Sequence, residues 1–334
     1  LGELNPSVRR ADELGTLRQM AETLIGRDPR QIEKLHALFD PASLDRIGFR
    51  ALSALDQAFW DILGKSLDAP VHALLGGACR DEIRLYANIN RATRDDRSPE
   101  AFARNATAAV SDGFDAIKLA PFDGLARGID KAEDAADGIA CMQAVRQAIG
   151  PNVDLLIDCH SHFTAKGALA VAKALADLDL FWFEEPVPDE DIAGYLEVKA
   201  KSGLPIAGGE SRMHRRGFWQ ACNDNILDIA MPDVTIVGGI CELKKVAAMA
   251  EARGIRTAPH GPFGPVTTAS SVHAMAAHPA FTILEYAWGE VPWRPTLTLP
   301  NEKISNGRIT LPQTPGLGIE LDEKIVAAHR IAIT

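Results

Sequence analysis

The chain has 334 residues, of which 46% are hydrophobic and 24% are charged, and its formal net charge is −10 at pH 7. This composition is typical of a folded globular protein and excludes a largely disordered chain. The acidic balance excludes nucleic acids and anionic membrane surfaces as partners, and no apolar run is long enough to span a bilayer.

Residues 1–82 are predicted to form a mostly helical capping domain. Three stretches, at 13–26, 28–39 and 48–65, carry apolar residues at helical spacing and have no strand-like run between them. The opening residues, LGELNPSVRR, read like the interior of a domain. We therefore expect part of this domain to precede them.

Residues 83–286 alternate short β-rich runs with longer stretches of helical period. Eight strands, each followed by a helix until the last, predict a modified (β/α)8 TIM barrel of the α/β class. An open, doubly wound sheet is the alternative, but it usually has fewer repeats and a glycine-rich phosphate turn, which is not seen here. The predicted strands are residues 82–90, 114–120, 153–158, 180–185, 204–210, 227–233, 255–260 and 281–286.

Residues 287–334 contain short strand-like pieces, at 296–299 and 303–312, and a final helical segment. We expect this end to pack with residues 1–82, so that the two form an α+β capping domain beside the barrel. No low-complexity tract and no repeat beyond the βα rhythm interrupts the chain.

The five cysteines predict a reduced, cytoplasmic protein. They are an odd number, they are widely scattered, and none shows a CxxC or Cys/His ligand spacing. This pattern supports neither a disulfide framework nor a zinc site. No secretory signal peptide is recognisable either.

Three predicted strands end in a carboxylate. Asp158 closes the third strand, Glu184 the fourth and Glu210 the fifth, with a constant separation of 26 residues. In a barrel these side chains would lie together at the C-terminal rim, where they would repel one another unless a cation bound them. Each alone could be an ordinary helix N-cap. Three in register favour a Mg²⁺ site, because Mg²⁺ prefers oxygen ligands.

The next two strands end in Asp233 and His260, which would lie within hydrogen-bond reach of each other. A carboxylate on one imidazole nitrogen raises the basicity of the other, which favours His260 as a general base. A buried, purely structural histidine is the alternative. Glu285, at the end of the eighth strand, faces the same mouth and can hydrogen-bond the substrate.

Three further side chains are candidates near this rim. His160 follows Asp158 by two residues, so it points the same way and can act as an acid opposite His260. His162 shares that parity but lies further into the loop. Lys118, near the end of the second strand, can bind a substrate carboxylate, although a snorkelling surface lysine is the alternative.

In these residues the chain resembles the mandelate racemase branch of the enolase superfamily over nearly its whole length. The motifs DCH, FEEP, GGE, MPDVTIVGGI and APHGPFGP, together with ALDQAFWDILGKSLDAPVHALLGG, carry the resemblance. It implies an enolase-like barrel, Mg²⁺ on the three carboxylates, an Asp233–His260 base dyad and Glu285 as a hydrogen-bonding acid. It also implies an N-terminal β-meander with mobile loops, much of which is absent here, and a homo-oligomer.

One difference from the family pattern reduces the number of activities that the resemblance allows. Many members carry Lys-x-Lys on the second strand, and here the tripeptide is Lys118-Leu119-Ala120, so the second lysine base is gone. The DxH motif with a His–Asp dyad is similar to galactonate dehydratase-like members. We therefore expect a lyase that removes the proton α to the carboxylate of a sugar acid and expels the β-hydroxyl, giving a 2-keto-3-deoxy acid. Mg²⁺, Lys118 and Glu285 would stabilise the enediolate.

Other activities remain open at this stage. A racemase, epimerase or cycloisomerase would use the same enediolate, and a Schiff-base aldolase would use Lys118 as a nucleophile. The sugar acid itself cannot be read from the sequence. Asn88 and Arg212 are candidate substrate-binding residues, and Phe263 is a further loop residue that bears on specificity.

Overall fold

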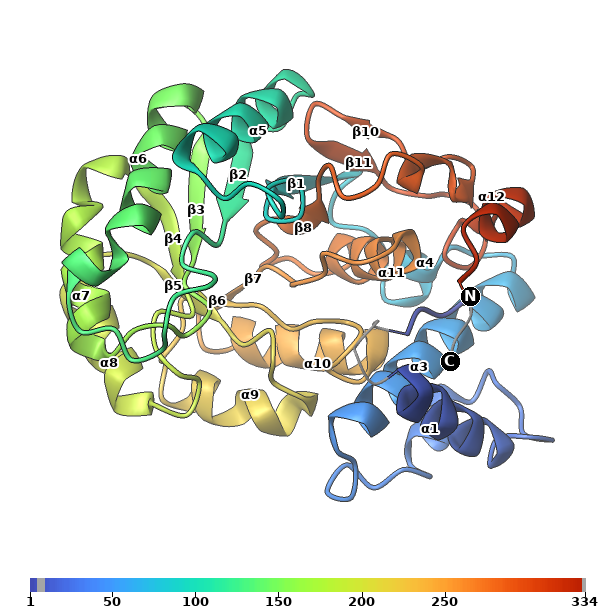
Figure 1. Ribbon diagram of the computed structural model, residues 1–334. Coiled ribbons are helices and arrows are strands. Elements are labelled where there is room, and N and C mark those ends of the chain that lie inside the picture. Colours follow the sequence, from blue (N-terminus) through green and yellow to red (C-terminus); the bar gives the residue numbers. More distant parts are fainter. Residues whose placement is uncertain (5–9, 332–334) are drawn as a thin grey trace.

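The computed structural model describes residues 1–4 and 10–331, and eight parallel strands form its central barrel (Figure 1). The strands pair in chain order from β1 to β7, β8 pairs with β1, and an isolated bridge joins Thr257 of β7 to Phe281 on the approach to β8. This closure confirms the predicted barrel. The strands are β1 (Glu82–Asn88), β2 (Ala116–Leu119), β3 (Asp154–Asp158), β4 (Leu180–Glu184), β5 (Ile206–Gly208), β6 (Ile229–Ala230), β7 (Arg256–Thr257) and β8 (Leu284–Ala287).

Helices surround the barrel strands (Figure 1). Several begin at a polar cap, because the side chains of Ser98, Thr164 and Asp191 each accept a hydrogen bond from the backbone N–H three residues later. No helix in the described part of the chain is long and apolar enough to cross a bilayer. The helices of the barrel are α5 (Pro99–Ser111), η1 (Ala132–Ala135), α6 (Ala136–Ile149), α7 (Ala165–Ala174), η2 (Ala176–Leu178), α8 (Ile192–Ser202), α9 (His214–Asn223), α10 (Gly239–Glu251) and α11 (Pro265–Ala276).

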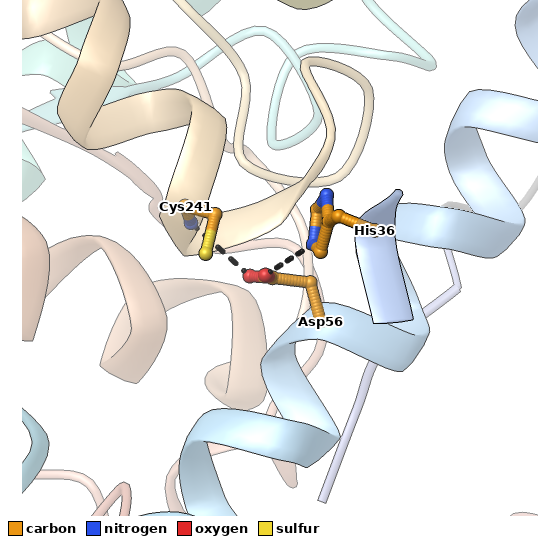
Figure 2. Close-up of side chains that lie close together, drawn as sticks. All are labelled: His36, Asp56 and Cys241. Carbon is orange, nitrogen blue, oxygen red and sulfur yellow. Dashed lines mark hydrogen bonds and ion pairs between the residues drawn. The ribbon is translucent and has the colours of Figure 1, made fainter. Parts of the chain in front are cut away.

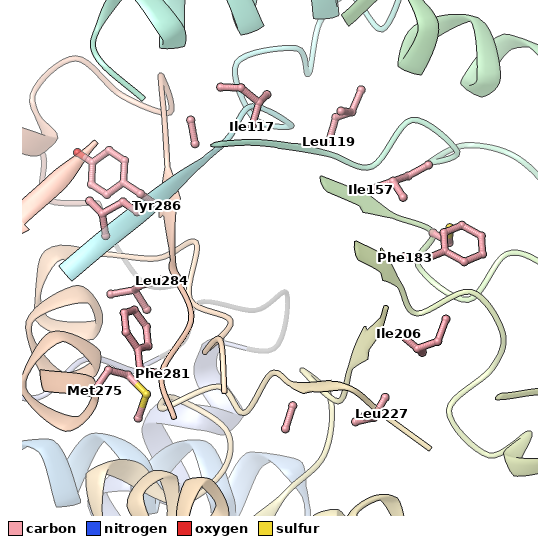
Figure 3. Packing of buried hydrophobic residues seen from close by; sticks show 14 of the residues in the cluster. Ile117, Leu119, Ile157, Phe183, Ile206, Leu227, Met275, Phe281, Leu284 and Tyr286 are labelled. Atoms are coloured by element: carbon pink, nitrogen blue, oxygen red, sulfur yellow. The ribbon is translucent and has the colours of Figure 1, made fainter. Parts of the chain in front are cut away.

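The barrel is filled from inside by one layer of apolar side chains and packed outside by another. Because neighbouring residues on a strand point to opposite faces, the two layers alternate along each strand. Figure 3 shows residues of the outer layer, such as Ile117, Ile157 and Phe183, between the strands and the helices. The inner layer consists of Tyr86, Ala116, Leu156, Trp182, Ala207, Ile229, Met231, Ala258 and Ile283.

The N-terminal part is helical, as predicted, but its second helix is shorter than the stretch 28–39 indicates. The Asp28 carboxylate accepts a hydrogen bond from the N–H of Arg30, which favours a turn over a helix start. The helix therefore begins later. The helices are α1 (Arg10–Glu22), α2 (Ile32–His36), α3 (Arg46–Ser66) and α4 (Val71–Leu74).

The C-terminal segment contacts both the N-terminal helices and the barrel. Leu317 donates its N–H to Asp61 of α3 at 2.9 Å, and β11 pairs antiparallel with β1. The domain boundaries at residues 82 and 286 stay a prediction. The elements of this segment are η3 (Arg294–Thr296), β9 (Thr298–Leu299), β10 (Ile304–Ser305), β11 (Arg308–Thr310), β12 (Glu320–Leu321) and α12 (Glu323–Ala328).

Asp56 joins the N-terminal helices to the barrel. Its carboxylate lies 2.7 Å from Nε2 of His36 and accepts the N–H of Cys241, at the start of α10, at 3.3 Å (Figure 2). Gly239 has a φ of +80°, and a Cβ there would lie 2.2 Å from Oδ1 of Asp56. Glycine is therefore required at this position for α3 to approach the N-terminal end of α10 this closely.

Candidate active site

Polar side chains form the top layer of the barrel interior, at or just beyond the C-terminal ends of the strands. Each lies two residues after a member of the apolar inner layer, so strand alternation points both inward. The predicted site residues with this relation are Asn88, Lys118, Asp158, Glu184, Asp233, His260 and Glu285.

Glu210 reaches the same rim by another route. It lies three residues after the inward-facing Ala207, so simple alternation would not place it there. Gly209 has a φ of +102°, and a Cβ at that position would lie 2.8 Å from the ring of Phe218. The glycine thus permits a turn that returns Glu210 to the rim, with Oε2 3.2 Å from Nε2 of His260.

Lys118 is the buried cation of the rim. Its Nζ lies 2.9 Å from Oε1 of Glu184, 3.0 Å from Oε1 of Glu285 and 4.0 Å from Oδ2 of Asp158. Burial alone would lower the pKa of Lys118, but the charges of Glu184 and Glu285 outweigh it and raise the pKa well above the usual range. The ammonium is therefore charged, which disfavours the Schiff-base aldolase, because that reaction needs a neutral amine.

Glu285 is held as an ionised acceptor. It receives hydrogen bonds from Nδ2 of Asn88 at 2.7 Å and from the N–H of Gly261 at 2.9 Å, besides the ion pair with Lys118. Burial would raise the pKa of Glu285, but Lys118 and then His260 outweigh it and lower the pKa to about 2. Glu285 can therefore accept a hydrogen bond from substrate.

Asp233 and His260 form the expected contact across the ends of neighbouring strands. Nδ1 of His260 lies 2.7 Å from Oδ2 of Asp233, while the other carboxylate oxygen accepts the N–H and the hydroxyl of Thr235, both at 2.7 Å. Burial would lower the pKa of His260, but Glu210, Glu285 and Asp233 outweigh it and raise the pKa to about 10. The geometry leaves Nε2 facing the rim.

His160 lies on the other side of the carboxylates. Its Nε2 is 2.8 Å from Oδ2 of Asp158, and its Nδ1 is 2.5 Å from Oδ1 of Asp123. The charge of Asp158, opposed by burial and supported by the hydrogen bond to Asp123, raises the pKa of His160 to about 12. This arrangement favours the imidazolium of His160, the form that can donate a proton.

The rim gathers side chains that could hold a metal ion. Ligand atoms of Asp158, His160 and Glu210 lie within 4.8 Å of one another, whereas Glu184 turns its carboxylate towards Lys118. Among the described residues, a buried oxygen of Glu185 lacks a hydrogen-bond partner, and the buried Oε2 of Glu210 has the ionic contact with His260 but no hydrogen bond. Burial, followed by the charges of Glu210 and Asp158, raises the pKa of Glu185 to about 8. Carboxylates in excess and oxygens without donors fit a bound cation.

Several predicted residues have other contacts here. Arg212 contacts Asp189 and the carbonyl of Gly217 through all three guanidinium nitrogens, so its substrate role stays a prediction. Nδ1 of His162 donates to the carbonyl of Ala126. Phe263 packs edge-on to His260, with ring centroids 5.7 Å apart.

Sequence reasoning missed four side chains that hold the site residues. Asp123 contacts His160, Thr235 orients Asp233, and the indole of Trp182 donates to Glu184 at 3.0 Å. The ring of Tyr86 lies 5.1 Å from Nζ of Lys118. The Asp-x-Thr spacing would have revealed Thr235, and strand parity Trp182 and Tyr86, but nothing local points to Asp123.

Comparison with known families agrees with this geometry. The family described as enolase C-terminal domain-like matches residues 101–325, and the mandelate racemase/muconate lactonizing enzyme N-terminal domain matches residues 2–76. The chain belongs to the mandelate racemase/muconate lactonizing enzyme family of the enolase superfamily. The resemblance of its strand-end motifs is thereby confirmed.

Relatives in this family include dehydratases and a cycloisomerase. The chain is 32% identical to D-gluconate dehydratase of Thermoproteus tenax, over 98% of this chain and 67% of that enzyme. It is 34% identical to D-galactarolactone cycloisomerase of Agrobacterium fabrum, over 92% and 82%, and 33% identical to D-galactonate dehydratase of Ralstonia nicotianae, over 92% and 81%. These names agree with the expected lyase and with the isomerase as its alternative.

Solved structures of the family superpose closely on this chain. A mandelate racemase/muconate lactonizing enzyme from Jannaschia sp. is 33% identical, with a TM-score of 0.89 over 100% of this chain and 89% of that one. An enolase superfamily member from Salmonella Typhimurium has the same TM-score at 28% identity, over 98% and 90%.

Proposed function

We propose that this protein is a Mg²⁺-dependent dehydratase that converts a sugar acid into a 2-keto-3-deoxy acid. One observation carries the proposal: two histidines approach one carboxylate cluster through Nε2, His260 at Glu210 and His160 at Asp158. Each has its Nδ1 on an aspartate. Loss of water needs a base for the α-proton and an acid for the leaving hydroxyl, and this pair supplies both.

Asp158, Glu184 and Glu210 are the residues that would hold the metal. When bound, Mg²⁺ offsets the negative charge that develops on the substrate carboxylate as the α-proton leaves. Lys118 lies at the same rim and adds a fixed positive charge, while Glu285 accepts a hydrogen bond from a substrate hydroxyl.

The two histidines then divide the reaction between them. A cation held by Glu210 would offset the charge that raises the pKa of His260, so that Nε2 of His260 can be neutral and take the α-proton. The C–H electron pair then enters the enediolate. The enediolate electrons form the α,β double bond as the Cβ–O bond breaks, and Nε2 of His160 gives its proton to the departing hydroxyl, which leaves as water. The enol product tautomerises to the 2-keto-3-deoxy acid. One proton is gained at His260 and one is lost at His160, so the net charge of the two histidines is unchanged.

An isomerase is the second candidate, because the cycloisomerase of Agrobacterium fabrum matches over 92% of this chain. Cycloisomerisation of a sugar lactone would use the same proton abstraction by His260. Racemisation is less favoured, since Ala120 stands where many members place the second lysine base. The location of the protein in the cytoplasm also stays a proposal, and it agrees with five free cysteines.

A substrate screen tests the proposal. The protein is incubated with Mg²⁺ and a panel of aldonic acids, aldaric acids and their lactones, and 2-keto acid is detected with semicarbazide. We expect keto acid from at least one sugar acid and none with His260→Asn. Isomerised lactone or racemised acid without keto acid would contradict the dehydratase and favour the isomerase.

A further inference from the structure

Asp123 contacts His160 on the side away from the carboxylate rim, with Oδ1 2.5 Å from Nδ1. We propose that Asp123 is a positioning residue for His160: it holds the Nδ1–H, so that the proton delivered to the leaving hydroxyl is the one on Nε2. The inference rests on the dehydration proposed above and assigns a part of its acid step to a loop residue outside the strand-end motifs.

Asp123 is itself held in place. Its second oxygen, Oδ2, lies 3.3 Å from Nη2 of Arg97, and the same guanidinium nitrogen also contacts the carbonyl of Ala120 at the end of β2. One carboxylate oxygen thus faces Arg97 and the other faces His160. The orientation of the carboxylate is thereby fixed before substrate binds, which is what a positioning residue requires.

The loops that carry Asp123 and His160 are fastened to each other. The N–H groups of Gly128 and Ile129 donate to the carbonyl of His162 at 2.8 and 3.1 Å. The rings of Phe122 and Phe163, both fully buried, pack edge to face with centroids 4.8 Å apart. The two loops therefore form one packed unit, and the distance between Asp123 and His160 does not depend on the hydrogen bond alone.

The backbone of His160 is also constrained. Its φ is +42°, a left-handed conformation that is unfavourable for a residue with a Cβ. The strained conformation is stabilised by its own N–H, which donates to Oδ1 of Asp158 at 2.9 Å, and by Ser161, whose N–H donates to the carbonyl of Glu185 at 2.8 Å. The ring is thus clamped between Asp158 and Asp123.

The two contacts of the His160 ring determine which of its nitrogens can exchange a proton. Nδ1 stays protonated because Asp123 accepts its hydrogen, so His160 can exchange a proton only at Nε2, on the rim side. When Nε2 gives its proton to the hydroxyl, the Cβ–O bond breaks, water leaves and a neutral imidazole remains. The hydrogen bond between Nδ1 and Asp123 keeps the Nε2 atom aimed at the rim before and after the transfer.

The Asp123–His160 pair resembles the Asp233–His260 pair on the opposite side of the rim, but the two aspartates differ in exposure, and this difference makes the proposal testable. Asp233 is fully buried, whereas the side chain of Asp123 is 35% exposed. Replacing Asp123 therefore leaves no buried group unpaired in the core, and its variants should fold. Asp154 is a matched control: its side chain is 36% exposed and pairs with Arg84, but it lies at the other end of β3.

The experiment compares wild type, Asp123→Asn, Asp123→Ala and Asp154→Asn on the sugar acid that wild type dehydrates. Each is also given the analogue that carries fluorine in place of the β-hydroxyl, because fluoride leaves without being protonated. We expect Asp123→Ala to lower kcat for water loss by about 10- to 100-fold. The kcat of Asp123→Asn for water loss should lie between those of wild type and Asp123→Ala, since the amide oxygen still accepts the Nδ1 hydrogen. In both Asp123 variants the rates of fluoride loss and of α-proton exchange in D₂O should equal those of wild type. All rates of the control Asp154→Asn should also equal those of wild type.

Two results would overturn the inference while leaving the dehydratase intact. One is an equal loss of water-releasing and fluoride-releasing activity in Asp123→Ala, which would indicate a general structural role. The other is unchanged water loss in that variant. A wild-type protein that forms no keto acid from any sugar acid would instead overturn the proposed function, and the inference with it.

Discussion

Lys118 and Glu184 form a bidentate ion pair beneath the rim, with Nζ 2.9 and 3.1 Å from the two carboxylate oxygens. Both side chains are almost completely buried. Removing the ammonium with Lys118→Met would leave Glu184 without its counter-ion and Glu285 with His260 alone, 3.6 Å away. Breaking a buried pair in this way costs about 3–5 kcal/mol, so we expect that loss in the free energy of unfolding, measured with urea, together with loss of activity. A variant as stable as wild type would show that Glu184 is protonated in the folded protein.

Magnesium should stabilise the protein through the rim carboxylates. At a Mg²⁺ concentration 100 times the Kd, the free energy of unfolding of wild type should rise by about 2.7 kcal/mol, and Glu184→Gln should show a smaller rise and no activity. Glu302→Gln is the control, because Glu302 is a buried partner of Arg294 outside the rim and its loss should leave the Mg²⁺ response unchanged. An equal response in all three proteins would contradict the metal assignment.

His260 should be indispensable for proton abstraction. In D₂O with an accepted substrate, His260→Asn should neither exchange the α-proton nor turn over. Asp233→Asn should lower the rate by about 10²-fold or more, because the imidazole loses the carboxylate on Nδ1. Both are measured by NMR of recovered substrate. Exchange that persists in His260→Asn would move the base to another residue.

Much of this site could be predicted because strand geometry is local and periodic. A residue two positions after an inward-facing apolar residue also faces inward, and this relation placed Lys118, Asp158 and Glu184 at the rim. The repeat of one βα unit then brought residues far apart in the chain to neighbouring strand ends. The pairing of His260 with Asp233 follows from the same rule.

Contacts made by loops could not be predicted in this way. Asp123 reaches His160 from a loop whose path depends on Phe122 and Phe163 packing together, and no spacing in the sequence encodes that packing. Arg212 follows a strand-end motif, and its guanidinium contacts Asp189, a partner that the motif does not predict. Loop partners are settled by tertiary packing rather than by period.

The close contact between α3 and the N-terminal end of α10 should depend on Gly239. In Gly239→Ala the new Cβ would meet the Asp56 carboxylate, and φ would remain +80°. Gly254→Ala is a matched control, since Gly254 has a φ of +73° but a methyl group there would have nothing within 4 Å. The left-handed backbone costs about 1–2 kcal/mol in both, and only Gly239→Ala should lose more. If the two variants lose the same free energy of unfolding in urea, the Asp56 side chain can move away from the new methyl group without destabilising the protein.

His273 should make stability fall in mild acid. It is fully buried in α11, where Nδ1 accepts the N–H of His72 at 3.2 Å and Nε2 donates to the carbonyl of Leu317 at 3.1 Å. Burial lowers the pKa of His273 to about 4, against an ordinary value of about 6.5 in the unfolded chain. Between these values the unfolded chain binds the extra proton, so the stabilising effect of His273 is complete above about pH 6.5 and is lost as the pH falls towards 4.

The size of this loss can be measured with one substitution. The linkage relation gives a destabilisation of about 2 kcal/mol at pH 5 and about 3 kcal/mol at pH 4 from His273 alone. In His273→Gln, whose amide can still donate to Leu317, that part of the pH dependence should vanish, while His329→Gln, at an exposed position, should follow wild type. Urea unfolding at about pH 7.5 and pH 5 tests this, because carboxylate titrations common to all three proteins cancel in the comparison. If His273→Gln loses as much stability as wild type between the two values, His273 is already protonated in the folded protein and its contact with the N–H of His72 must break.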